Sequence, residues 1–419
     1  MGSDNASVMK ISQLDQANTT VPRMVEYLFD LAIRAGASDI HMGINNVPGD
    51  KQRYLLRLRV AGRLRVVKSQ FINSHYDEVI QRVKILAGLN TTNIGLPQDG
   101  QIVLERGGGD DVTLRVAIIP NQEAEEVCIR IQRNERFITM DQLLMTEKMF
   151  NNVQDLIRRQ NGMIILNGPA GSGKTTTILS FLHELAGPEK KIITAEDPIE
   201  RRLPFVNHVQ VTEKAGYAEL SRTYMRQDAD IIFIGEIRDA ESAITSVQLA
   251  QTGHLVLTTL HTRDSIGVIA RMKAFDIHPN FIADTLIGSL AQRLVLGLCH
   301  HCKVEYQPDP RILKNCEKIL PPPDGVKFYK EGPGCDKCTE VVNGEVIMKG
   351  SSGLVPIFEL FVVDSEIQEA INREQTKIEI RELARKRGMT TLAEEALLRV
   401  YQGYIDLASV YGSVFSNRD

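Results

Sequence analysis

The sequence predicts an α/β fold in which a mostly parallel sheet carries a phosphate-binding loop. The apolar run Met163 to Leu166 predicts a strand, a glycine-rich loop follows it, and a helical pattern comes next. From there to about Leu298, short β-branched runs alternate with helical patterns, which is typical of a parallel sheet with helices on both faces. The further strand candidates are Ile192 to Ala195, Ile231 to Ile234 and Val256 to Thr259.

A separate small α/β domain is predicted before this sheet. Residues 21–35 have helical spacing, 54–67 alternate with period two around a glycine turn, and 83–89 resemble a second helix. Two further strands are expected at 112–119 and 127–131. We therefore expect a flexible start at 1–20, an N-terminal domain at 21–133, a linker at 134–146 and a nucleotide-binding domain at 147–419, closed by C-terminal helices at 363–412.

Composition limits the classes of protein to consider. A chain of 419 residues is long enough for two or three domains. No apolar run approaches the length of a membrane helix, and the start lacks a signal region, so we expect a cytoplasmic protein with at most peripheral membrane contact. The net charge of -4 and the sparse aromatic residues give no support for nucleic-acid binding.

The strongest single signal is the run from Gly168 to Thr175, Gly-Pro-Ala-Gly-Ser-Gly-Lys-Thr. Glycines let successive backbone amides turn toward phosphate oxygens, and the following helix adds its positive N-terminal end. Lys174 is expected to reach the β and γ phosphates of ATP, and Thr175 to ligate Mg²⁺. The predicted nucleotide ligands in this run and its first helical turn are Gly168, Gly171, Ser172, Gly173, Lys174, Thr175 and Thr176.

Acidic and histidine residues follow the later strands. Glu236 comes just after the apolar strand 231–234, and the segment Glu196-Asp197-Pro198-Ile199-Glu200 follows the strand at 192–195. Carboxylates at the carboxyl ends of parallel strands meet at the edge where phosphates bind, although capping of a helix is an alternative role. His254 and His261 flank the strand 255–260, where an imidazole can sense the γ phosphate or bridge neighbouring subunits; a structural role is the alternative.

Two cysteine pairs predict a structural zinc site. Cys299-His300-His301-Cys302 and Cys335-Asp336-Lys337-Cys338 have the spacing of a four-thiolate tetrahedral centre. The segment between the pairs is rich in proline and charge, so a metal would be its main source of order. Unpaired thiols or a redox pair are the alternatives.

Taken together, these motifs resemble the ATPases of type II secretion and type IV pilus machines, the GspE/PilB/PilT group of the additional-strand RecA-like superfamily. The resemblance covers nearly the whole chain after about residue 21. Its motifs here are Gly36 to His41, Pro97 to Gly100, the Walker A loop, the Asp box Glu196 to Glu200, the Walker B segment Arg226 to Asp239 and the His box Thr252 to Thr262.

The resemblance implies a RecA-like ATPase domain with a zinc-binding insertion at 299–338, after a small PAS-like α/β domain. It implies that Glu200 activates water and that Glu236 supports Mg²⁺ and the transition state. Arg115 and Arg130 match arginines that the family's N-terminal domain lends to the nucleotide. Glu196, Asp197, His254 and His261 fall in the family's boxes. Ala229, Gly95 and Leu296 depart from the usual pattern, which suggests a divergent branch.

The same resemblance implies partners and direction. Family members form homo-hexameric rings that move an inner-membrane platform protein, and the tetracysteine element accompanies assembly and secretion ATPases. We therefore expect an ATPase that uses ATP and Mg²⁺, holds Zn²⁺ and drives pilus assembly or type II secretion. A retraction or conjugative-pilus motor, a nucleic-acid translocase and a weakly hydrolysing regulatory module are the alternatives.

Overall fold

The computed structural model describes residues 9–10, 20–46, 53–60, 62–104, 112–133, 137–212, 214–342 and 345–410. The chain forms two compact units. One contains residues 1–135 with the short segments 301–303 and 331–353, and the other contains the remainder. Nearly all of the predicted flexible start lies outside the described residues.

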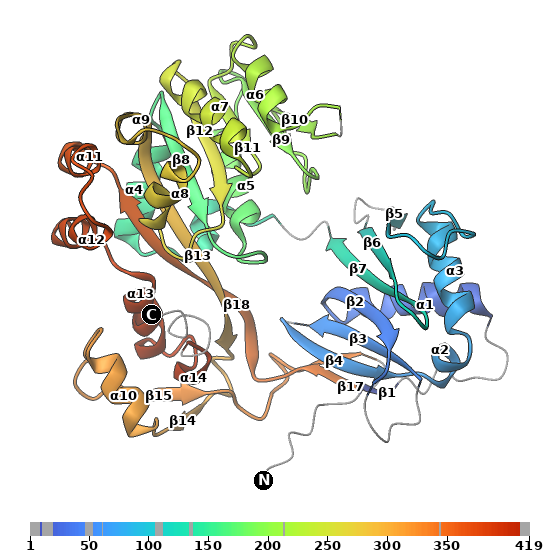
Figure 1. Ribbon diagram of the computed structural model, residues 1–419. Helices are drawn as coiled ribbons and strands as arrows, with labels where there is room; N and C mark the ends of the chain where they lie inside the picture. Colours follow the sequence, from blue (N-terminus) through green and yellow to red (C-terminus); the bar gives the residue numbers. More distant parts are fainter. Residues whose placement is uncertain are drawn as a thin grey trace. The chain divides into compact units, whose positions relative to one another are not determined.

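The first unit is a seven-stranded sheet covered by helices (Figure 1). Its strand order is β1-β4-β3-β2-β7-β6-β5, antiparallel except for the β1 and β4 pair. The elements are β1 (Met9–Lys10), α1 (Val21–Arg34), β2 (Ala37–Ile44), β3 (Tyr54–Val60), β4 (Arg63–Lys68), α2 (Gln70–Ser74), α3 (Tyr76–Leu86), β5 (Gln98–Leu104), β6 (Val112–Pro120) and β7 (Glu125–Arg133).

The predicted hairpin and the later strand pair are confirmed as β3/β4 and β6/β7. The second helix begins earlier than predicted, at Tyr76, whose ring stacks on Tyr54 and whose hydroxyl donates to the backbone oxygen of Glu125. The strands β2 and β5 were not predicted from the pattern. In β2, Ala37, Ile40 and Met42 are buried, but Asp39 is buried among them, which breaks the alternation of apolar and polar residues.

The second unit is built on a seven-stranded sheet of order β10-β9-β11-β12-β8-β13-β18. Pairing is parallel from β10 to β13. Its first half comprises the 3₁₀ turn Met140–Leu143, α4 (Glu147–Ile157), β8 (Gly162–Asn167), α5 (Lys174–Leu185), β9 (Ile192–Glu196), β10 (Val206–Gln210), α6 (Tyr217–Tyr224), β11 (Ile231–Ile234), α7 (Ala240–Gln251), β12 (Leu255–Leu260), α8 (Gly267–Lys273) and α9 (Pro279–Thr285).

The remaining elements extend this sheet or lie in the cysteine region, and β16 and β17 among them belong to the segment 331–353 of the first unit. They are β13 (Leu286–Leu298), β14 (Val304–Tyr306), α10 (Pro310–Glu317), β15 (Phe328–Lys330), β16 (Glu340–Val342), β17 (Glu345–Met348), β18 (Ser351–Val362), α11 (Ser365–Asn372), α12 (Lys377–Lys386), α13 (Leu392–Tyr401) and α14 (Leu407–Val410). The long β13 and β18 project beyond the other strands, and α10, α13 and α14 gather along the projection (Figure 1). Their apolar residues form a core of their own.

Both faces of the central strands are buried, as a parallel sheet between helices requires. Along β8, Met163 and Ile165 join the core that includes α6, α7 and α11, whereas Ile164 and Leu166 join the core that includes α4 and α5. The predicted α/β class with strands alternating with helices is confirmed. Within the described residues, none of the helices is both long enough and apolar enough to span a bilayer.

A buried ion pair ties α3 to β7 in the first unit. The Lys84 ammonium donates to Glu125 Oε1 at 2.7 Å and to the Asn93 carbonyl at 3.2 Å, and both side chains of the ion pair are almost fully buried. We predict that Glu125→Ala lowers the free energy of unfolding by about 3–5 kcal/mol, because it leaves a buried charge without its partner. Arg34→Ala removes the exposed pair with Asp30 and is expected to cost about 0.5 kcal/mol or less. Denaturant unfolding of both variants tests this, and equal losses would contradict it.

Candidate functional site

The glycine-rich loop lies between β8 and α5 and is shaped by backbone that favours glycine. Gly168, Gly171 and Gly173 have φ angles of 153°, 74° and 86°. A Cβ on Gly168 would lie 2.5 Å from Ser172 Oγ, and one on Gly173 would lie 2.8 Å from Gln292 Nε2. The loop therefore turns its amides inward at the N-terminus of α5, which is the geometry that receives a phosphate.

A pocket of about 190 Å³ lies against this loop at the carboxyl ends of the strands. Most of the predicted carboxylate and histidine residues line it together with the loop lysine. The predicted residues that line it are Gly171, Lys174, Thr175, Glu196, Asp197, Glu200, Glu236 and His261. The structure thus brings residues from four separate segments into one site.

Lys174 is nearly buried and points back along its loop. Its ammonium donates to the carbonyl oxygens of Gly168 and Pro169, at 2.8 and 3.1 Å. Burial lowers the pKa of Lys174, and the nearby Glu236 carboxylate works in the opposite direction. A cation held this close to inward-facing amides is placed to pair with phosphate oxygens.

Glu236 stands between a histidine and an arginine. Its Oε2 lies 3.4 Å from His261 Nε2, and its Oε1 pairs with Arg238 Nε. His261 is fixed on its other side, since Nδ1 lies 3.0 Å from the Gly168 carbonyl oxygen. Glu236 is therefore connected through His261 to the start of the phosphate loop.

Arg238 was not predicted as a site residue. Its guanidinium joins Glu236 to Asp197, with 3.2 Å to Asp197 Oδ2, and lies over the Tyr217 ring. The pKa of Arg238 is raised: burial opposes the charge, but the contacts with Glu236 and Asp197 outweigh it. Its position two residues after Glu236 was the only available signal, because the second partner comes from another strand. Tyr217 also lines the pocket and was not predicted.

Glu196 is buried at the end of β9 and has a partner within its own sheet. Its Oε1 lies 2.6 Å from both His208 Nδ1 and Thr194 Oγ1. His208 Nε2 accepts the backbone N–H of Leu203, so the ring proton is on Nδ1 and is donated to Glu196. The other carboxylate oxygen of Glu196 is buried with no hydrogen-bond partner within the described residues, which leaves it able to accept a further donor.

Of the other predicted nucleotide ligands, those in the loop and the first turn of α5 lie near this pocket, whereas His254 does not. Ser172 lines a neighbouring recess of about 480 Å³ together with His261, Arg263 and Arg293. Gly168 begins the loop, and Thr176 is exposed on the first turn of α5. His254 lies at the opposite end of β12 from His261, where its Nδ1 is 2.9 Å from the Leu249 carbonyl oxygen. It does not line the pocket.

Arg115 and Arg130 lie in the first unit. They face each other on β6 and β7, and both are exposed on the same face of the sheet. Arg130 Nε donates to Asp39 Oδ1 at 3.1 Å, and Arg59 lies 3.5 Å from the other oxygen of the same carboxylate. The pair of arginines is therefore a cationic surface patch fixed in part by Asp39.

The four predicted cysteine ligands gather in one cluster. The sulfur atoms of Cys299, Cys302, Cys335 and Cys338 all lie within 4.8 Å of one another, and none is in a disulfide. The sulfurs of Cys302 and Cys335 are 3.5 and 3.7 Å from Cys338 Sγ. A Zn–S length of about 2.3 Å in a tetrahedron requires a sulfur separation of about 3.8 Å. The cluster therefore fits a four-thiolate metal site.

The sequence matches a family model described as "Type II/IV secretion system protein" over residues 15–412. The chain belongs to this family. It is 38% identical over 402 residues to the type IV pilus assembly ATPase PilB of Thermus thermophilus, covering 95% of this chain and 43% of that protein. It is 35% identical over 393 residues to the type II secretion system ATPase E of Vibrio cholerae, covering 93% of this chain and 74% of that protein.

The family resemblance expected from the motifs is thus confirmed. The two relatives are a pilus assembly ATPase and a type II secretion ATPase, which agrees with the predicted assembly and secretion branch. The chain spans less than half the length of the Thermus protein and about three quarters of the Vibrio protein.

Solved structures agree on the fold. The ATPase DotB of Legionella pneumophila superposes with a TM-score of 0.69 at 20% identity, covering 99% of this chain and all of that one. The pilus retraction motor PilT with bound ADP superposes with a TM-score of 0.60 at 23% identity, covering 93% and 96%. These likenesses confirm the RecA-like P-loop fold that was predicted.

The loop geometry predicts how sensitive nucleotide binding is to a single methyl group. We expect Gly173→Ala to weaken ATP binding at least about tenfold, because an L-residue at this φ is strained by about 1–2 kcal/mol and its Cβ meets Gln292. Gly187→Ala is the matched control, since its Cβ meets no other atom within 4 Å. Equilibrium titration with a fluorescent ATP analogue measures both. Equal affinities in the two variants would count against the loop as the phosphate site.

Proposed function

We propose that this chain is the ATP-hydrolysing motor of a type IV pilus assembly or type II secretion machine. The observation that carries this is the convergence of Lys174, Glu200, Glu236 and His261 in one pocket beside the phosphate loop. The names of the Thermus and Vibrio relatives point to the same work. ATP is the proposed substrate, and the products are ADP and phosphate.

In this proposal the pocket residues divide the chemistry between binding and activation. The loop amides and Lys174 hold the phosphates. His261, which lies beside Glu236, contacts the γ phosphate and so distinguishes ATP from ADP. Glu200 accepts a proton from the attacking water, while Glu236 supports the transition state. The oxygen donors that line the pocket with Thr175 include the Glu196 and Asp197 carboxylates, and oxygen ligands suit Mg²⁺. Mg²⁺ held there by Thr175 would neutralise charge on the phosphates.

Arg115 and Arg130 are proposed to stabilise charge that develops on the γ phosphate. Two guanidinium groups opposite each other on one exposed sheet face form a suitable anion contact. In a homo-hexameric ring, which we propose for this chain, they would act within one subunit or on the next. The proposed membrane partner is an inner-membrane platform protein, with the motor in the cytoplasm at the membrane surface.

The tetracysteine cluster is proposed to hold one structural Zn²⁺. Backbone N–H groups of Gly350 and Cys335 point at Cys338 Sγ, at 3.2 and 3.4 Å, and such contacts stabilise a thiolate. This element also favours assembly or secretion over retraction. A retraction or conjugative-pilus motor is the second candidate, supported by the fold it shares with PilT.

Two substitutions test the catalytic assignment. We expect Glu236→Gln and Lys174→Ala each to lower kcat for ATP hydrolysis at least about a hundredfold, because each removes electrostatic support from the transition state. Glu184→Gln on α5 is the control, since its exposed carboxylate pairs with Arg158 at 3.6 Å and does not line the nucleotide pocket. Steady-state phosphate release measures all three. Turnover near that of the unmodified protein in the first two variants would refute the assignment.

Adding single-stranded DNA tests whether the motor acts on a protein machine or on a nucleic acid. A motor of a pilus or secretion machine should hydrolyse ATP at the same rate with and without added DNA. Strong stimulation would instead identify a nucleic-acid translocase.

The zinc assignment predicts about one zinc ion per chain by elemental analysis, from its four-ligand stoichiometry. Cys335→Ser or Cys338→Ser should release the metal and lower the melting temperature of the protein. Cys128→Ser, outside the cluster, should retain it. A folded, metal-free protein would refute zinc binding.

A further inference from the structure

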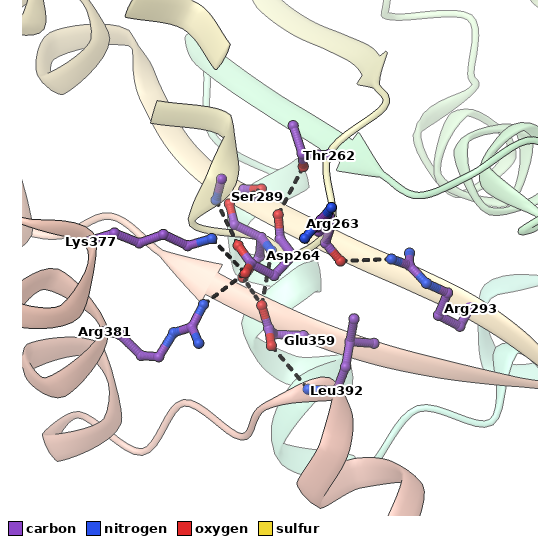
Figure 2. Close-up of polar contacts among 11 residues, drawn as sticks. Thr262, Arg263, Asp264, Ser289, Arg293, Glu359, Lys377, Arg381 and Leu392 are labelled. Carbon is purple, nitrogen blue, oxygen red and sulfur yellow. Dashed lines mark hydrogen bonds and ion pairs between the residues drawn. The ribbon is translucent and has the colours of Figure 1, made fainter. Parts of the chain in front are cut away.

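The segment His261 to Ser265, which we call the sensor loop, joins the nucleotide pocket to the C-terminal helices. It directly follows β12, and His261 at its start touches Glu236 and the Gly168 carbonyl oxygen. Three residues later, the Asp264 carboxylate forms ion pairs with two cations of α12 (Figure 2). Lys377 Nζ and Arg381 Nη2 each lie 2.7 Å from Asp264 Oδ2.

Asp264 also organises the loop itself. Its Oδ1 accepts the backbone N–H of Gly267 at 2.8 Å, at the start of α8. Its backbone oxygen accepts the Thr262 hydroxyl at 2.8 Å. The pKa of Asp264 is lowered even though burial raises it, because Lys377, Arg381 and the Gly267 N–H all favour the charged form. The ionised carboxylate therefore links the loop to the start of α8 and to α12, and the backbone oxygen of Asp264 fixes Thr262 within the loop.

A second buried carboxylate holds the end of the loop. Glu359 on β18 accepts the backbone N–H and the hydroxyl of Ser265 at Oε1, and the backbone N–H of Leu392 at Oε2. Leu392 is the first residue of α13. One side chain thus connects the loop to the start of a C-terminal helix.

The third support comes from β13. Arg293 donates to the carbonyl oxygen of Arg263 at 2.7 Å, and Ser289 donates to the carbonyl oxygen of Ser265 at 2.8 Å. Ser289 in turn accepts the amide of Asn167, the residue just before the phosphate loop, at 2.5 Å. The sensor loop is consequently held by contacts from β13, β18 and α12, and Glu359 links it to the start of α13 (Figure 2).

We propose that Asp264, held by Lys377 and Arg381, is a positioning residue for His261, through which α12 controls the rate of ATP hydrolysis. This rests on the role of His261 in the proposed function. Asp264 lies outside the lining of the nucleotide pocket, so it acts by fixing the loop that carries the histidine. Movement of α12 that loosens this grip shifts His261 from Glu236 and slows turnover without weakening ATP binding.

The test compares kcat with affinity in Asp264→Asn. The change is isosteric and leaves an oxygen for the Gly267 N–H, but it removes the charge that attracts Lys377 and Arg381. We expect kcat to fall about ten- to a hundredfold, as for a misplaced group beside a reacting atom, with ATP affinity within about twofold of that of the unmodified protein. Lys377→Met with Arg381→Met should reproduce this from the α12 side. Glu374→Gln, which breaks the exposed pair with Lys273, is the matched control and should leave kcat unchanged.

A double-mutant cycle separates positioning from a general structural role. If Asp264 acts through His261, adding Asp264→Asn to His261→Ala should cause little further loss of kcat. Fold losses that multiply, or an unchanged kcat in Asp264→Asn, would overturn the proposal. A parallel loss of affinity and melting temperature would do the same. Failure of the proposed function is distinguishable, because Lys174→Ala and Glu236→Gln would then retain turnover.

Discussion

The parallel register of four strands is the constraint on which the site depends. Ile231 of β11 pairs with Ile192 of β9 and with Leu255 of β12, and Leu255 pairs with Gly162 of β8. Since all four strands run in the same direction, their carboxyl ends meet at one edge. Glu196, Glu236, His261 and the phosphate loop each lie at or just beyond the end of one of these strands, so sheet pairing alone brings them together.

This constraint explains why much of the site could be predicted from the sequence. A strand followed by a loop shows which residues lie at the sheet edge without any knowledge of tertiary contacts. The glycines at 168, 171 and 173 likewise predict a loop with positive φ angles. The cysteine pairs were equally readable, because two short spacings define the metal geometry. In these cases the chemistry is encoded locally and the sheet or the metal supplies the rest.

Contacts that depend on a distant partner were not predictable. Arg238 gains its position from Asp197, and the predicted residue Glu196 is oriented by His208 on the neighbouring strand, which the sequence did not reveal. The strand β13 was missed because Ser289, Gln292 and Arg293 interrupt its apolar pattern. Each of these finds a polar partner inside the fold: Ser289 bonds Asn167, Gln292 accepts the Thr177 hydroxyl and Arg293 bonds the Arg263 carbonyl oxygen. A polar residue in a buried strand thus misleads pattern analysis wherever the partner comes from elsewhere in the chain.

The contacts of the sensor loop differ in kind from those that hold the C-terminal helices in place. Apolar burial fixes α13 and α14 against β13 and β18. The stabilisation that it gives is non-directional and falls in proportion to the apolar area that becomes exposed. Glu359 is almost fully buried and is held by neutral donors from Ser265 and Leu392. Losing either donor leaves part of a buried charge without compensation, which costs several kcal/mol. Small independent shifts of the loop or of α13 are therefore unfavourable, so the two should move together. A carboxylate at this junction suits such concerted movement better than an apolar contact would.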